Sequence, residues 1–165
     1  CGKTYGNKKM TMDHMYPQDM GGPTITNNLL PSCQKCNNEK SDMTKQQYEK
    51  YKKLKKTGKH KKYLEDLKVQ KEFIRNWHGY EIPDEWISER EISTIMLEVR
   101  LGDCTKTAQY KKLENFYSRY GHIPKPIIVD KNGFLLDGFY SVIFAKNNLI
   151  PSLPVIELEN VEVIM

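Results

Sequence analysis

Two cysteines separated by two residues, Cys33 and Cys36, constrain the fold of this chain more than any other feature. In a cytosolic protein such a pair more often binds a metal or takes part in catalysis than forms a structural disulfide. Two thiolates at this spacing suit tetrahedral Zn²⁺, with Zn–S distances of about 2.3 Å. A metal would also support a small unit, because a domain of about 80 residues buries little surface. We therefore predict a structural zinc site in the first part of the chain, and we expect the distant Cys104 to be a packing residue.

The charge of the chain changes sign along its length. Residues 1–80 carry 17 Lys and Arg against 8 Asp and Glu, net +9, whereas residues 81–165 carry 9 against 13, net −4. We expect two domains with these limits, of which only the first has the composition of a polyanion-binding protein. No apolar stretch of about 18 residues and no apolar leader is present, so the expected location is the cytoplasm.

Lysines are concentrated in one segment, where nine of them lie between Lys45 and Lys62. This density produces a positive potential that attracts phosphates, although a lysine-rich run is also typical of a solvated helix face. Lysines at phosphates fix the position of a nucleic acid rather than read its bases. The residues that we expect to contact nucleic acid are Lys40, Lys45, Lys52, Lys53 and Lys56.

The positions of Gly and Pro residues and the spacing of the apolar residues predict an α+β fold. Gly and Pro residues interrupt the first forty residues, where we expect a small ββα unit with strands at 9–14 and 25–30 and a first helical turn at 37–40. Thr44 and Gln47 have the spacing of a capping box, which predicts a helix over 45–56; a second helix is expected over 60–77. The elements expected beyond residue 90 are a strand at 93–101, a helix at 107–120, a strand at 126–130, a tight turn at Asn132-Gly133, a helix at 138–148 and a strand at 153–158.

The pair Asp13-His14 and the later Asn37 carry side chains that suit phosphodiester hydrolysis. An imidazole near neutral pH can accept a proton from water, so His14 is a candidate general base. Asp13 and Asn37 offer the oxygen ligands that Mg²⁺ or Mn²⁺ favours. Neighbouring residues of a strand point to opposite faces, so Asp13 and His14 can serve one phosphate only at a strand end or a local distortion. Each of these residues taken singly also fits a surface pair or a turn.

Together these residues resemble an HNH endonuclease of the zinc-containing ββα-metal type. The resemblance covers about residues 1–45, and its members keep their order: Asn28 lies fourteen residues after His14, and Asn37 lies twenty-three after it. It implies that His14 activates water, that Asp13 and Asn37 bind the catalytic cation, and that Asn28 braces the loop that aims His14. The last position of the family signature is often His, and Asn37 is an accepted variant there.

Members of that family use two Cys-x-x-Cys pairs for structural zinc. Cys33 and Cys36 would be one pair, and Cys1 resembles the end of the other, whose companion would lie upstream. The expectation is therefore a sequence that begins part-way through a larger protein, or after a disordered or cleaved segment. His60 or a water molecule is the alternative for the fourth zinc ligand.

The second half resembles a ParB/sulfiredoxin-like domain over about residues 92–160, through 126–130, the Asn132-Gly133 turn and the helix that follows Gly138. That family commonly has His or Arg after the glycine, where this chain has Phe139-Tyr140-Ser141, so no nucleotide cofactor is expected. The half is expected to serve specificity or contact with a protein partner.

The leading hypothesis is a metal-dependent HNH endonuclease that cleaves DNA. Two other classes stay open: a zinc-stabilised DNA-binding module without cleavage, and a ParB-like, nucleotide-responsive DNA-binding protein. The DNA-binding module would give Asp13 and His14 no function. For the ParB-like protein, the basic residues after Gly138 are missing.

Overall fold

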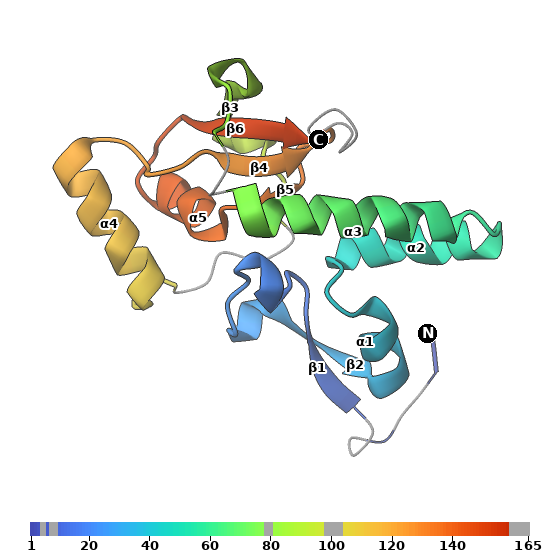
Figure 1. The fold of residues 1–165 in the computed structure, drawn as a ribbon. Coiled ribbons are helices and arrows are strands. Elements are labelled where there is room, and N and C mark those ends of the chain that lie inside the picture. Colours follow the sequence, from blue (N-terminus) through green and yellow to red (C-terminus); the bar gives the residue numbers. More distant parts are fainter. Residues whose placement is uncertain (4–5, 7–9, 78–80, 98–103, 159–165) are drawn as a thin grey trace. The chain divides into compact units, whose positions relative to one another are not determined.

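A computed structural model of the chain describes residues 1–3, 6, 10–77, 81–97 and 104–158 (Figure 1). The described chain forms two compact units, and the division between Lys68 and Val69 falls inside helix α3 (His60–Asn76). The domain limits expected from the sequence, residues 1–80 and 81–165, remain a prediction. The mixed α+β class is confirmed.

The first unit begins with the expected ββα arrangement. Strand β1 (Met10–His14) pairs antiparallel with β2 (Leu29–Cys33), so that Met10 lies opposite Cys33 and His14 opposite Leu29. Helix α1 (Gln34–Lys40) follows directly. The second strand is later than the predicted 25–30, because Thr26–Asn28 form a 3₁₀ turn in which Asn28 is buried. This turn, which ends at the buried Asn28, therefore delays the start of the strand that the apolar residues suggested.

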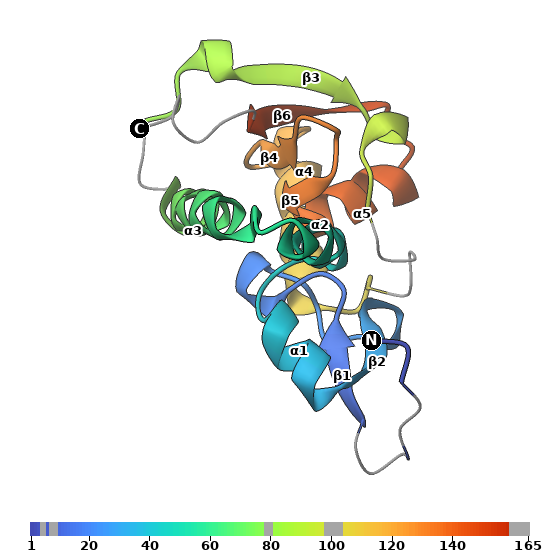
Figure 2. The same cartoon turned by 90° about the vertical axis from the view of Figure 1, so that its right-hand side faces the viewer.

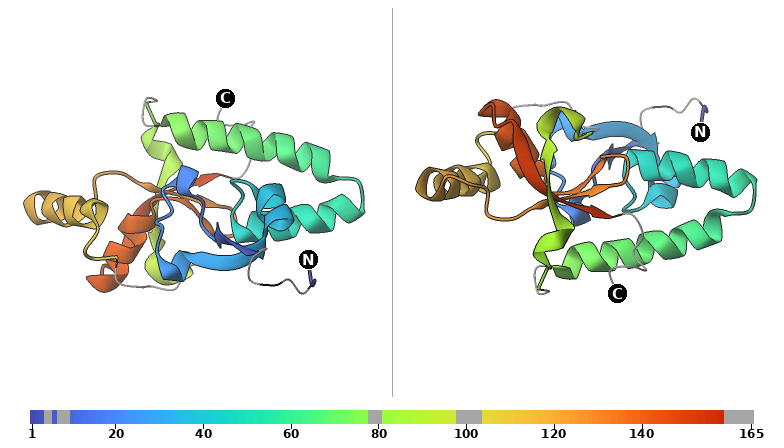
Figure 3. Two further views of the ribbon diagram at one scale, coloured as in Figure 1. Left: turned by 90° about the horizontal axis from the view of Figure 1, so that it is seen from below. Right: turned by 90° about the horizontal axis from the view of Figure 1, so that it is seen from above.

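Two helices complete the first unit as a hairpin. Helix α2 (Lys45–Lys56) has the predicted bounds, and Thr44 and Gln47 form the reciprocal hydrogen bonds of the capping box. It runs beside the beginning of α3, as Figure 3 shows. The helices meet over a small aromatic core made of Met43, Tyr48, Tyr51 and Leu67, with Tyr63 packed against it.

The second unit contains a four-stranded mixed sheet. Its strand order is β3 (Ile87–Glu91), β6 (Ser152–Leu158), β4 (Ile127–Asp130) and β5 (Leu135–Asp137), as Figure 2 shows. Only the central pair β4 and β6 is parallel. Apolar side chains on β4 are fully buried, which identifies it as the centre of the core.

Helices α4 (Ala108–Tyr120) and α5 (Phe139–Asn147) agree with the predicted segments. They pack through the ring of Phe144, whose centroid lies 5.6 Å from that of Tyr110 and 5.1 Å from that of Tyr117. Cys104 is completely buried, which fits its expected role in packing.

Two predictions for the second unit were wrong in detail. The strand expected at 93–101 is replaced over Ile92–Thr94 by a 3₁₀ turn, and Met96 makes a single bridge to Phe134; residues 98–103 lie outside the described part. Strand β3, which was not predicted, has an exposed and charged sequence typical of a sheet edge. The tight turn predicted at Asn132-Gly133 is instead a three-residue hairpin loop. Gly133 has φ of 85° and donates its N–H to the Asp130 carbonyl, whereas Asn132 does not have the positive φ that a two-residue turn would require.

No helix within the described residues is both long enough and apolar enough to pass through a membrane.

Gly138 allows a test of packing at the start of α5. Its φ is 99°, and a Cβ there would lie 2.4 Å from Cγ2 of the buried Ile127. Gly121 has φ of 75° with nothing within 4 Å of the same point. Both Gly→Ala variants should lose roughly 1–2 kcal/mol through backbone strain, and Gly138→Ala should lose about 1–3 kcal/mol more through overpacking. Urea unfolding measures both losses, and equal values would contradict the packing argument.

Candidate active site and metal centre

His14 is the last residue of β1, and a strand end is the position at which Asp13 and His14 could serve one phosphate. Its Nε2 atom lies 3.0 Å from Thr24 Oγ1, which also accepts a hydrogen bond of 2.7 Å from Gln18 Nε2. Partial burial lowers the pKa of His14; the nearby Asp13 carboxylate opposes this shift, and the Lys40 ammonium adds to it. A lowered pKa keeps more of the imidazole in the neutral form, which is the form that can accept a proton.

Asn28 lies behind His14 and is completely buried. Its Oδ1 accepts the Tyr16 N–H at 2.8 Å, and its Nδ2 donates to the carbonyls of Tyr16 at 2.9 Å and Pro23 at 2.8 Å. The backbone carbonyl of Asn28 also accepts the Met15 N–H at 2.9 Å. One residue therefore holds the chain that follows His14 together with the segment that precedes Thr24.

Gly22 makes this loop possible. A Cβ at that position would lie 2.0 Å from the Tyr16 carbonyl oxygen, and the Gly22 N–H donates to the Pro17 carbonyl at 2.9 Å. Two backbone segments therefore approach each other more closely than a side chain would permit.

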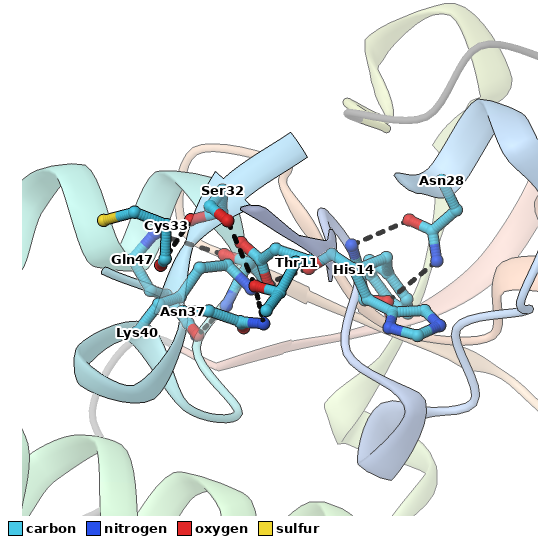
Figure 4. A network of polar contacts seen from close by, with 11 residues as sticks. Thr11, His14, Asn28, Ser32, Cys33, Asn37, Lys40 and Gln47 are labelled. Carbon is cyan, nitrogen blue, oxygen red and sulfur yellow. Dashed lines mark hydrogen bonds and ion pairs between the residues drawn. The ribbon is translucent and has the colours of Figure 1, made fainter. Parts of the chain in front are cut away.

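Asp13 and Thr11 lie on one face of β1, two residues apart, and meet one face of α1. Lys40 Nζ is 2.9 Å from Asp13 Oδ1 and donates to the His14 carbonyl at 2.6 Å. One turn earlier, Asn37 Nδ2 donates to Thr11 Oγ1 at 2.9 Å, and the Thr11 hydroxyl donates to the Ser32 carbonyl at 3.1 Å. Figure 4 shows Asn37, Thr11 and Ser32 in this network. These contacts use the amide nitrogen of Asn37 and leave its oxygen without a hydrogen bond to any described residue.

The structure thus brings Asp13, His14 and Lys40 into direct contact and places Asn28 against the loop beside them. Asn37 lies on the same side of α1 as Lys40, and no hydrogen bond joins it to Asp13 or His14 within the described ranges. The contact between Lys40 and Asp13 was not predicted from the sequence. The sequence indicates it only through the i, i+3 spacing of Asn37 and Lys40, which places both residues on one face of a helix.

The lysines expected at a nucleic acid differ in exposure. Lys40 has an exposed fraction of 3%, and its ammonium is turned inward. The others are exposed on α2, and one of them, Lys52, lies 4.9 Å above the centroid of the Tyr48 ring. These four exposed residues are Lys45, Lys52, Lys53 and Lys56.

Three cysteines lie close enough together to hold a metal ion. The sulfur atoms of Cys1, Cys33 and Cys36 lie within 4.8 Å of one another, and those of Cys1 and Cys33 are 3.8 Å apart. Thiolates around tetrahedral zinc are separated by about 3.8 Å, given Zn–S bonds of about 2.3 Å. The Cys36 N–H also points at Cys33 Sγ, at 3.5 Å. The donor set and its spacing fit Zn²⁺.

His60 is not a member of this group. The group found among the described residues contains only the three cysteines, and the His60 ring instead packs edge-on against Tyr51 with centroids 5.8 Å apart. The alternative that His60 supplies the fourth zinc ligand is therefore wrong.

Tyr48 of α2 connects this helix to α1. Its hydroxyl donates to Glu39 Oε2 at 2.8 Å, and Glu39 also pairs with Lys55. Burial raises the pKa of Tyr48, and the neighbouring Glu39 and Cys36 raise it further. The phenol therefore stays a donor. Nothing in the sequence pattern distinguishes this hydroxyl from those of the other tyrosines.

Comparison with known proteins agrees with this geometry. Residues 1–53, about a third of the chain, match the model of an HNH endonuclease family, and the cluster of Cys1, Cys33 and Cys36 fits an HNH nuclease. Comparisons with curated proteins and with solved structures gave no match. The resemblance stated for the first part of the chain is thus confirmed, and the ParB/sulfiredoxin-like assignment of the second half stays a prediction.

Replacing Asn28 should destabilise the first unit. Asn28→Ala removes three buried hydrogen bonds and leaves the backbone groups of Tyr16 and Pro23 unsatisfied, so we expect a loss of about 2–4 kcal/mol. Asn27→Ala is the matched control, because Asn27 lies in the same turn and is exposed. Denaturant unfolding should separate the two variants, and a loss below 1 kcal/mol for Asn28→Ala would contradict the bracing role.

A zinc site made of Cys1, Cys33 and Cys36 predicts which cysteine substitutions lower the affinity for zinc. Cys33→Ser should weaken zinc binding by more than about 100-fold, because even residues outside the ligand set commonly change metal affinity by 10–100-fold. Cys104→Ser should leave zinc affinity unchanged, since Cys104 is buried in the second unit. Competition with a chromophoric chelator measures both affinities. Wild-type affinity in Cys33→Ser would exclude the site.

Proposed function

We propose that the first unit is a metal-dependent endonuclease centre that hydrolyses the phosphodiester bonds of DNA. The observation that carries the proposal is the placement of His14 at the end of β1, beside the Asp13 carboxylate and with its ring held against Thr24. The match of residues 1–53 to an HNH endonuclease family supports the same reaction class.

In this proposal His14 is the general base. Its lowered pKa favours the neutral ring, which accepts a proton from a water molecule as that water attacks phosphorus. Asn28 keeps the ring in position through the loop at Met15, Tyr16 and Pro23. A Mg²⁺ or Mn²⁺ ion held by Asp13 and Asn37 would stabilise charge on the phosphate and on the departing 3′ oxygen.

The exposed lysines of α2 would hold the DNA backbone. Lys45, Lys53 and Lys56 present their charges to solvent on the helix that follows the site. The Lys45 N–H donates to the Met15 carbonyl at 3.0 Å, which ties the start of α2 to the residue after His14. Phosphates bound along this helix would therefore be held in a fixed relation to His14. The second unit would contribute specificity or a contact with a protein partner.

One observation favours a second candidate, a zinc-stabilised DNA-binding module without cleavage. Asp13 is ion-paired with the buried Lys40, which is a contact that a purely structural carboxylate would also make. The two candidates agree on DNA binding and differ on cleavage.

Plasmid nicking by zinc-loaded protein tests the reaction. We expect conversion of supercoiled to open circular DNA with Mg²⁺ or Mn²⁺ and none with chelator. His14→Ala should reduce the rate by about 10²–10⁴, the usual contribution of a general base, while binding in a gel-shift assay is retained.

His122→Ala is the matched control for this experiment, because His122 is an exposed histidine of the second unit. Its nicking rate should equal that of the native chain. Undiminished nicking by His14→Ala would remove His14 from the mechanism, and DNA binding without any nicking by the native chain would favour the non-catalytic module.

A further inference from the structure

The buried ammonium of Lys40 forms an ion pair with the carboxylate of Asp13, which is the candidate cation ligand. Its exposed side-chain fraction is 4%, that of Asp13 is 15%, and the two charged atoms are 2.9 Å apart. The second contact of Nζ, to the His14 carbonyl at 2.6 Å, holds the ammonium at the end of β1. An exposed lysine can move away from such a site at little cost, whereas Lys40 is held there by two partners.

Charge balance at this place limits what the free protein can bind. Asp13 contributes one negative charge and Lys40 one positive charge, while the neighbouring Asn37 and Thr11 are neutral. Cation affinity in proteins rises with the number of charged oxygen ligands. A divalent ion on Asp13 would share that carboxylate with an ammonium, so the two cations would repel each other.

We propose that Lys40 neutralises Asp13 in the free protein, so that the divalent cation binds tightly only together with a phosphodiester. A backbone phosphate supplies the negative charge that the protein side chains lack. This inference rests on the proposed function, and it gives Lys40 a role different from the phosphate contact expected from the sequence. Its burial supports the change, because Lys45, Lys53 and Lys56 of α2 present their charges to solvent and can meet the DNA backbone instead.

Titration of the zinc-loaded protein with Mn²⁺, followed by electron paramagnetic resonance of the free ion, tests this without any cleavage. Native protein should bind Mn²⁺ weakly. Lys40→Met and Lys40→Gln, which remove the charge, should bind at least tenfold more tightly, whereas Lys40→Arg, which keeps it, should bind as the native protein does. A merely structural role predicts weaker binding in every variant, so tighter binding is specific to charge compensation.

Two variants control this titration. Lys35→Met removes one positive charge from an exposed position on the same helix and should change Mn²⁺ affinity by less than about twofold, as expected for a screened surface charge. Asp13→Asn should abolish the binding. Unchanged or weaker Mn²⁺ binding by both neutral Lys40 variants, with native circular dichroism, would overturn the inference.

A second measurement keeps Lys40 in place, because loss of one partner of a buried ion pair can unfold a protein. In the His14→Ala background, a short DNA duplex should raise Mn²⁺ affinity at least tenfold, and Mn²⁺ should raise duplex affinity by the same factor. The same titration with Asp13→Asn in that background subtracts Mn²⁺ bound by the DNA itself. Absence of coupling would overturn the inference.

Failure of this inference and failure of the proposed function give different results. Mn²⁺ binding that survives Asp13→Asn would remove Asp13 as the cation ligand, and both proposals would fail on that point. Cation-dependent nicking that requires His14, combined with tight Mn²⁺ binding by the free native protein, would leave the endonuclease intact and remove only the role of Lys40.

Discussion

The ion pair between Lys40 and Asp13 is the interaction on which the candidate site depends. It joins the last residue of α1 to the strand that carries His14, and the same ammonium holds the His14 carbonyl. Loss of either partner of a buried pair is destabilising, because the remaining charge would be left without compensation. The position of α1 against β1 is therefore determined by electrostatics as well as by packing. At the other end of α1, Cys36 lies in the first turn and Cys33 is the N-cap, so the candidate metal centre and the candidate active site share one helix.

The loop between the two strands of the ββα unit is held by hydrogen bonds to a buried amide. Its backbone is held by the amide of Asn28 and by the close approach at Gly22, and its side chains Tyr16 and Met20 are buried as well. A fully buried amide with three partners is stable only when all of them are in place, since each lost partner leaves a desolvated group. These contacts hold the loop beside His14, and they account for the complete burial of a polar side chain.

The second unit has its own core, centred on β4 and on helix α5. At the end of β5, Asp137 accepts the indole N–H of Trp77 at 3.1 Å, which ties the last turn after α3 to the sheet. The residue that precedes α5 is Gly138, which has no side chain with which to cap the helix. In its mixed sheet, β6 pairs with β3 and β4, which are both distant from it in the sequence. We propose that this unit contributes specificity or a contact with a protein partner.

The amino-acid sequence by itself determined the elements with local signals: the capped helix α2, helices α4 and α5, the central strand β4, and the order of Asp13, His14, Asn28 and Asn37. Capping boxes, turn glycines and helical periods act over a few residues, so they can be read from the chain alone. Strand β2 and the edge strand β3 were misplaced or missed, since their boundaries depend on a buried turn and on pairing with a distant partner. Only the tertiary structure decided that Lys40 turns inward to Asp13, whereas the family resemblance already grouped Cys1 with Cys33 and Cys36 and the structure added the distances between their sulfur atoms. These contacts join residues 27 and 32 positions apart, and no local rule governs which side of a helix meets a strand so distant in the chain.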